Sequence, residues 1–105
     1  MATWCALAGS APATPGYDWP GMKKCGSFEA SLRIYVYAND RLRCVQARRI
    51  MREYWLGPDR RKVVVNGGTG ADGYVKLKRY RGWRCYGGSG GGTCKRRAAV
   101  AGYQN

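Results

Sequence analysis

The cysteines set the strongest limit on what this chain can fold into. There are five of them in 105 residues, and a domain of that size buries only a modest core. Small exported domains compensate for a modest core with disulfide bonds, whereas cytosolic proteins rarely contain them. The cysteine content therefore predicts an exported, disulfide-tied domain.

The sequence leaves the pairing of the cysteines open, because two bridges among five cysteines allow roughly fifteen arrangements. If the strand after Cys25 packs antiparallel to the next helix, Cys25 and Cys44 lie on the order of 30 Å apart at ~3.3 Å per strand residue, too far for a bond. We therefore expect a bridge between Cys44 and Cys85. The second bridge then joins Cys25 to Cys94 and leaves Cys5 free. In the alternative arrangement, Cys85 pairs with Cys94 across a hairpin and Cys5 pairs with Cys25.

Composition divides the chain into two parts. Residues 1–24 contain all but one of the four prolines, and we expect them to form an irregular extension. Residues 25–105 are expected to fold as a single α+β domain. The aromatic side chains able to pin the extension onto that domain are Trp4, Tyr17 and Trp19.

Alternation of apolar and polar residues predicts the strands. It is clearest in SLRIYVY, residues 31–37, and in YVKLKRY, residues 74–80. Shorter apolar runs predict two further strands at 61–65 and 97–103. The glycine-rich segments between them are expected to be turns.

One amphipathic helix is predicted between the first two strands, over residues 41–55. Asn39 or Asp40 is expected to cap its start, and Gly57 is expected to end it. Spacing at 100° per residue defines its core-facing side. The residues on that side are Cys44, Ala47, Ile50, Met51, Tyr54 and Trp55. The element order β-α-β-β-β predicts an α+β fold, with one helix packed on a small antiparallel sheet.

The residue types that catalysis needs are scarce. The absence of histidine excludes Ser-His and Cys-His nucleophile pairs and Cys/His zinc sites. The six acidic residues are scattered singly. The glycine run at 67–73 lacks the lysine of a phosphate-binding loop and opens no helix. We therefore expect no catalytic site, no metal and no cofactor.

The charge is strongly unbalanced, with 19 Lys and Arg against 6 Asp and Glu, a net charge of +13. An excess of this size predicts an anionic partner, which is a nucleic acid, a cell-wall polymer or another acidic polysaccharide. Within the helix, Arg41, Arg48 and Arg52 fall within about 40° of each other. The full set of candidate contact residues is Arg41, Arg48, Arg49, Arg52, Lys76, Lys78, Lys95, Arg96 and Arg97.

Tyrosines alternate with the basic residues on the outer faces of two predicted strands. If the strands at 31–37 and 74–80 are neighbours, the sheet offers stacking rings between cations, as binders of single-stranded nucleic acid do. The candidate stacking residues are Tyr35, Tyr37, Tyr74 and Tyr80. The alternative is an ordinary solvated sheet face, since tyrosine is a good strand former.

Three segments carry a family resemblance: LRCVQARRIMREYWLG, GWRCY and CKRRAAV. Together they resemble small secreted, cysteine-containing proteins of actinobacteria of unknown function, over residues 25–105. This chain departs from that pattern in the arginine before Cys44, in the missing glycine after Cys94 and in the additional Cys5. The resemblance implies export and structural disulfides.

These observations predict a non-enzymatic, exported domain that binds anionic polymers or surfaces electrostatically. The start of the chain lacks the pattern of a signal peptide, and we interpret Met1 as standing where one was removed. No stretch of the sequence is suited to span a membrane. One alternative is a nucleic-acid-binding protein, encoded by a phage, in a reducing cytosol. Another is a cationic, membrane-active toxin.

Overall fold

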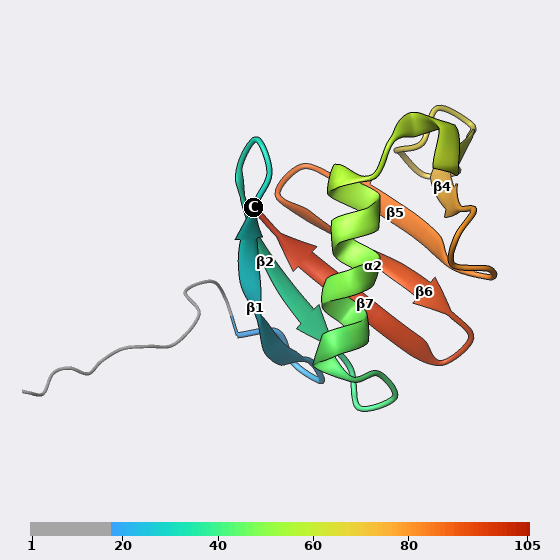
Figure 1. The fold of residues 1–105 in the computed structure, drawn as a ribbon. Helices are drawn as coiled ribbons and strands as arrows, with labels where there is room; N and C mark the ends of the chain where they lie inside the picture. The colour runs from blue at the N-terminus through green and yellow to red at the C-terminus, as the bar shows by residue number, and fades with distance from the viewer. Residues whose placement is uncertain (1–17) are drawn as a thin grey trace, which may run out of the picture.

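The structure is a computed structural model that describes residues 18–105. The predictions for Trp4, Cys5 and Tyr17 lie outside the described residues. Seven strands, one α-helix and one 3₁₀ turn follow each other in these residues (Figure 1). They are β1 Lys23–Glu29, β2 Arg33–Ala38, α2 Cys44–Leu56, η2 Asp59–Arg61, β3 Lys62–Val65, β4 Tyr74–Leu77, β5 Arg84–Gly88, β6 Gly91–Arg96 and β7 Ala99–Gln104.

The seven strands form one sheet in the order β1-β2-β7-β6-β5-β4-β3, with every neighbouring pair antiparallel. Helix α2 lies against one face of this sheet and contacts β1, β2 and β7 (Figure 1). The predicted class, one helix packed on an antiparallel sheet with disulfides, is confirmed. The predicted β-α-β-β-β pattern is wrong in its strand count, because β1, β5 and β6 were not predicted.

Strand β1 escapes prediction because its alternation is broken. Its two buried residues, Cys25 and Phe28, are three positions apart, whereas a regular strand buries every second residue. The pairing register with β2 shifts between Lys24 and Ser27. Gly26 lies inside that bulge with φ +96°, a conformation that glycine adopts without steric cost.

The bulged strand also explains why the predicted disulfide pairing is wrong. The structure joins Cys25 to Cys44 and Cys85 to Cys94. Strand β1 runs antiparallel to β2 and places Lys24 opposite Tyr37, near the end of β2. Cys25 therefore lies beside the start of α2, where Cys44 stands, and not at the far end of a single strand.

The same bonds decide between the remaining arrangements. The expected pairs Cys44–Cys85 and Cys25–Cys94 do not form. The bridge between Cys85 and Cys94 in the alternative arrangement is confirmed, across the β5–β6 hairpin. Its second bridge, between Cys5 and Cys25, is wrong because Cys25 is bonded to Cys44.

Helix α2 begins at Cys44, later than predicted, and Arg43 is its N-cap residue. The predicted cap at Asn39 or Asp40 is wrong, because Asn39 belongs to a separate turn before the helix, in which its Oδ1 accepts from the backbone N–H of Arg41 at 3.2 Å. The Asn39 side chain also bonds to the β6–β7 turn. Its Nδ2 donates to the carbonyl oxygen of Ala98 at 2.7 Å. Its Oδ1 accepts from the backbone N–H of Val100 at 3.1 Å. Asn39 thus fastens the segment before the helix to the β6–β7 turn.

The core lies between α2 and the sheet. Ala47, Ile50 and Met51 of the helix are fully buried, as predicted for the core-facing side. The remaining predicted residues of that side pack at the border of the core, and they are Cys44, Tyr54 and Trp55. Beyond the helix, Trp83, the residue before β5, is exposed to only 1% and belongs to the same core. The opposite face of the sheet, which we call the open face, has no helix over it.

Candidate polyanion-binding surface

Alternation along three neighbouring strands sorts their side chains between the two faces. Val75 and Leu77 of β4 are buried on the helix side, as are Cys85 of β5 and Cys94 of β6. Successive side chains point to opposite faces of a sheet. The intervening residues therefore lie on the open face, and they are Tyr74, Lys76, Arg84, Tyr86, Thr93 and Lys95.

Three of these residues form a straight line of positive charge across the sheet. Lys76 is directly opposite Arg84, and Arg84 is directly opposite Lys95. Neighbouring strands are about 4.8 Å apart, so the three stems stand at that interval. We call Lys76, Arg84 and Lys95 the cation row. All three side chains are exposed.

The ends of the cation row carry no acid. Val63 of β3 stands opposite Lys76, and Val100 of β7 stands opposite Lys95. Within residues 18–105, the ion pairs are Lys24–Asp18, Arg33–Glu29 and Arg61–Glu53. None of them includes a residue of the cation row. Like charges directly opposite each other destabilise a strand pair, so the row is unfavourable in the isolated protein.

Two tyrosines lie beside the cation row on the same face. The rings of Tyr74 and Tyr86 are 5.6 Å apart between centroids. The guanidinium of Arg84 lies over the Tyr74 ring at 5.0 Å, and the ammonium of Lys95 lies 5.8 Å from the Tyr86 centroid. These cation–π contacts hold the charged groups against the face of the sheet.

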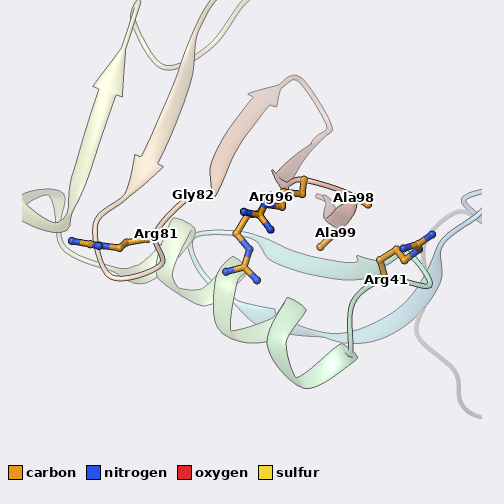
Figure 2. Close-up of a pocket in the computed structure, with 7 residues that line it drawn as sticks. Arg41, Arg81, Gly82, Arg96, Ala98 and Ala99 are labelled. Atoms are coloured by element: carbon orange, nitrogen blue, oxygen red, sulfur yellow. The ribbon is translucent and has the colours of Figure 1, made fainter.

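A wide hollow of about 790 Å³ lies at the end of the sheet where the β4–β5 loop meets the β6–β7 turn. Four arginines line it, together with Gly82, Ala98 and Ala99: they are Arg41, Arg81, Arg96 and Arg97. Figure 2 shows Arg41 and Arg81 at opposite ends of the hollow, with their side chains extended away from Arg96. The arginines therefore form a broad basic rim and do not converge on a single point.

A second, smaller hollow of about 290 Å³ shares the β4–β5 loop with the first. Arg81 and Gly82 line both hollows. The other basic residues of the second hollow are Lys76, Lys78 and Arg84. Basic residues therefore extend without a break from the cation row, around the β4–β5 loop, to the first hollow, which we call the arginine hollow.

The arginine stripe predicted on the helix is partly used inside the protein. The Arg48 Nη1 group donates to the carbonyl oxygen of Cys25 at 2.9 Å. The Arg52 guanidinium lies over the Phe28 ring at 5.0 Å. Arg49 is exposed, whereas Arg41 precedes the helix and lines the arginine hollow. The four arginines are therefore not brought together as one contact face.

The predicted stacking residues are also dispersed. Strands β2 and β4 are separated by β7, β6 and β5, so Tyr35 and Tyr37 are far from Tyr74. Tyr37 is fully buried, and its hydroxyl donates to Gln104 Oε1 at 2.8 Å. Burial raises the pKa of Tyr37 above 10.0. Tyr80 packs against the core.

Arg84 and Tyr86 were not predicted as site residues. They flank Cys85 in the segment RCYGG, which the glycines made look like a loop. The sequence did contain a signal for them. If Cys85 is buried within a strand, alternation places both of its neighbours, Arg84 and Tyr86, on the opposite, exposed face. Their partner Tyr74 and the two lysines of the row were among the predicted residues.

On the half of the open face formed by β2 and β7, the Trp19 side chain covers the sheet. The Trp19 ring lies 5.2 Å from the ring of Tyr37. A Cβ atom at Gly102 would lie 2.7 Å from a carbon of the Trp19 ring, so the indole rests on the backbone of β7. Beside it is a hollow of about 440 Å³ lined by Trp19, Gln104 and the glycines of the β5–β6 turn.

Protein-family models, curated proteins and solved structures were compared with the chain, and none of them matches it. The resemblance to secreted actinobacterial proteins therefore stays a prediction. In the described part of the chain, no helix combines the length and the apolar character needed to cross a membrane.

Proposed function

We propose that this protein is a non-enzymatic domain that binds anionic polymers through the cation row and the adjoining basic loops. The observation that carries this proposal is the uncompensated alignment of Lys76, Arg84 and Lys95 on three neighbouring strands. An anionic polymer lying across the strands neutralises all three charges at once. Binding then relieves a repulsion that the free protein has to bear.

The β6–β7 turn supports the same proposal. Arg97 has a φ of +55°, in the left-handed region that favours glycine or asparagine. An arginine at such a position costs about 1–2 kcal/mol. Arg97 therefore adds a positive charge to the arginine hollow at a position where glycine or asparagine would be more stable.

We propose that the protein acts outside the cytosol. The two disulfides support this location, since thiols of cytosolic proteins are kept reduced. The proposal of a cytosolic nucleic-acid-binding protein requires these four cysteines to be reduced. Counting free thiols in the natively purified protein separates the two: one free thiol agrees with export, and five agree with the cytosol.

The binding proposal is tested with two double variants of equal net charge. Arg84→Gln with Lys95→Gln removes two charges of the cation row, and Arg49→Gln with Arg52→Gln removes two exposed charges of α2. Affinity for fluorescein-labelled heparin and for duplex DNA is measured by anisotropy at about 0.15 M salt, where charges are screened over about 8 Å. We expect the row variant to lose at least tenfold and the helix variant to lose less than threefold, since distant charges act weakly through salt.

Two outcomes contradict the proposal. If the two variants lose equal affinity, the protein binds through its net charge and not through the cation row. If the wild-type protein binds neither polymer at low salt, polyanion binding itself is wrong. Leakage of dye from anionic vesicles tests the membrane-active alternative in the same samples.

A further inference from the structure

The proposed function does not specify which class of anionic polymer binds. The side chains on the open face of the sheet favour one class. Resting on that function, we propose that the ligand is single-stranded nucleic acid laid across the strands, with phosphates along the cation row and bases over the neighbouring rings. The proposal depends on two parallel rows of side chains and on a hollow beside them.

The second row is aromatic and runs parallel to the first. Tyr86 of β5 is opposite Thr93 of β6, and Thr93 is opposite Gly102 of β7. Gly102 lies beneath the Trp19 indole, and Tyr74 lies beside Tyr86 on β4. We call Tyr74, Tyr86 and Trp19 the aromatic row. It crosses the sheet one row away from Lys76, Arg84 and Lys95.

The spacing of the two rows fits a nucleotide. They are separated by two residues along each strand, about 7 Å, a gap that the sugar between a phosphate and its base can span. Thr93 is the one small side chain between Tyr86 and Trp19, which leaves space between the two rings. Proteins that bind single strands combine the same two features, cations along the backbone and rings under the bases.

A hollow with room for a base lies on the far side of the aromatic row from the cations. It has a volume of about 440 Å³ and is lined by Trp19, Gln104 and residues 89–92. Gln104 is opposite Gly91 and Tyr35, in the row beyond Trp19. Its amide oxygen accepts from the Tyr37 hydroxyl at 2.8 Å, so Gln104 forms part of the wall of the hollow beside Trp19.

The charge at this hollow also orients the ligand. Asp18 lines the hollow, and it is the one acid among the described residues that lines any of these three hollows. Its carboxylate is paired with Lys24 at 3.1 Å, and none of the described residues that line the hollow is basic, so the hollow attracts a phosphate much less than the cation row does. Phosphates are therefore favoured on the side of the cation row, and bases on the side of Trp19.

A single strand fits this face better than a duplex does. In a duplex the base faces are stacked on each other, so the aromatic row has nothing to contact. The guanidinium of Arg84 over Tyr74 adds a second kind of stacking plane, which unpaired bases also use. An acidic polysaccharide satisfies the cations but offers no flat aromatic ring to the tyrosines.

The test compares ligands that differ only in their bases. The probes are an oligothymidylate, an abasic deoxyribose-phosphate strand of equal length, a duplex and heparin, all measured by anisotropy at one low salt concentration. We expect the oligothymidylate to bind about tenfold or more tightly than the abasic strand, because each stacked base contributes ~1–3 kcal/mol. Tyr86→Ala should remove most of that difference, and it should lower the affinity for the abasic strand and heparin by about threefold or less, because Lys95 loses its contact with the ring but keeps its charge.

Tyr86→Phe is the matched control, because it keeps the ring and should keep the tenfold preference. Quenching of tryptophan fluorescence gives a readout that does not depend on the alanine variant. Thymidylate should quench the wild-type protein, and Trp19→Phe should abolish that quenching. Equal affinity of the wild-type protein for the oligothymidylate and the abasic strand overturns the inference and leaves polyanion binding intact. No binding to any probe overturns both.

Discussion

Arg84 and Lys95 lie directly opposite each other on β5 and β6, and the next pair of the same ladder is the disulfide between Cys85 and Cys94. The two charges repel across the ladder on the open face, while the disulfide holds the same two strands together on the helix side. This arrangement keeps an unfavourable charge pair in a fixed register. We interpret it as the structural basis of the proposed polyanion-binding surface.

The first prediction concerns salt. Repulsion within the cation row and across a +13 chain is screened over about 8 Å at physiological ionic strength. The free energy of unfolding of the free protein should therefore rise with chloride concentration. Arg84→Gln should reduce this rise, because Arg84 has a like charge on each side. Urea unfolding across a salt series measures both, and a stability that falls with salt contradicts the prediction.

The second prediction separates the two disulfides. Each closes a short loop, and in the chain-entropy model each contributes about 3 kcal/mol. The paired variants Cys25→Ala with Cys44→Ala and Cys85→Ala with Cys94→Ala should both lose about that much stability. Only the second pair should also lose affinity for heparin, because only that bridge fixes the β5–β6 register. Equal affinities of the two variants, each measured well below its melting temperature, would show that the bridge does not organise the surface.

The third prediction concerns pH. Two hydrogen bonds from Arg61, at 2.8 and 2.9 Å, hold the pKa of the buried Glu53 below its ordinary value of 4.5, and burial opposes that shift. A carboxyl with a lowered folded-state pKa stabilises the protein above its unfolded-state pKa. That stability is lost as the pH falls through the folded-state value. Stability should thus decline as the pH falls below the ordinary value of 4.5.

The variant Glu53→Gln tests this assignment. It removes the titrating group, so its stability should depend less on pH below 4.5 than that of the wild-type protein does. Thermal melts from pH 7 to 2.5 provide the comparison. Parallel curves for the two proteins would show that other carboxyl groups account for the acid sensitivity.

The fourth prediction concerns Asn39, which the sequence suggested as a helix cap. Because its side chain joins the loop before α2 to the β6–β7 turn and also accepts from the backbone N–H of Arg41, Asn39→Ala should destabilise the protein by about 2–3 kcal/mol through three lost hydrogen bonds. Asp40 is exposed, and Asp40→Ala should change stability by less than about 0.5 kcal/mol. The reverse order of the two effects would restore Asp40 as the cap.

The sequence predicted those elements whose apolar residues are regularly spaced within the element itself. Strands β2 and β4 and the core face of α2 follow from periodicity, because Ile34 and Val36, Val75 and Leu77, and the apolar side of the helix are buried at the expected spacing. Strands β5 and β6 were not predicted, since glycine disfavours strands on its own. In the folded protein Gly92 is required by packing: a Cβ there would lie 2.8 Å from the Tyr103 ring. That contact comes from β7 and is not visible within β6.

The same limit applies to the candidate site. Lys76 and Lys95 were recognised as basic residues of outer faces, but their alignment with Arg84 depends on which strands are neighbours. That order places β5 between β4 and β6, and no local pattern encodes it. The disulfide error has the same origin, since one unpredicted strand moved Cys25 to the opposite end of the sheet.

The salt dependence of polyanion affinity tests the central claim most directly. Each phosphate contact releases counterions, so the logarithm of affinity falls linearly with the logarithm of salt, by about 0.7 to 0.9 per contact. For one labelled polyanion, the slope of Arg84→Gln with Lys95→Gln should be shallower than that of the wild-type protein by up to ~2. The slope of Arg49→Gln with Arg52→Gln should stay at the wild-type value. Coinciding slopes of the wild-type protein and the row variant would contradict the claim that the cation row is the contact surface.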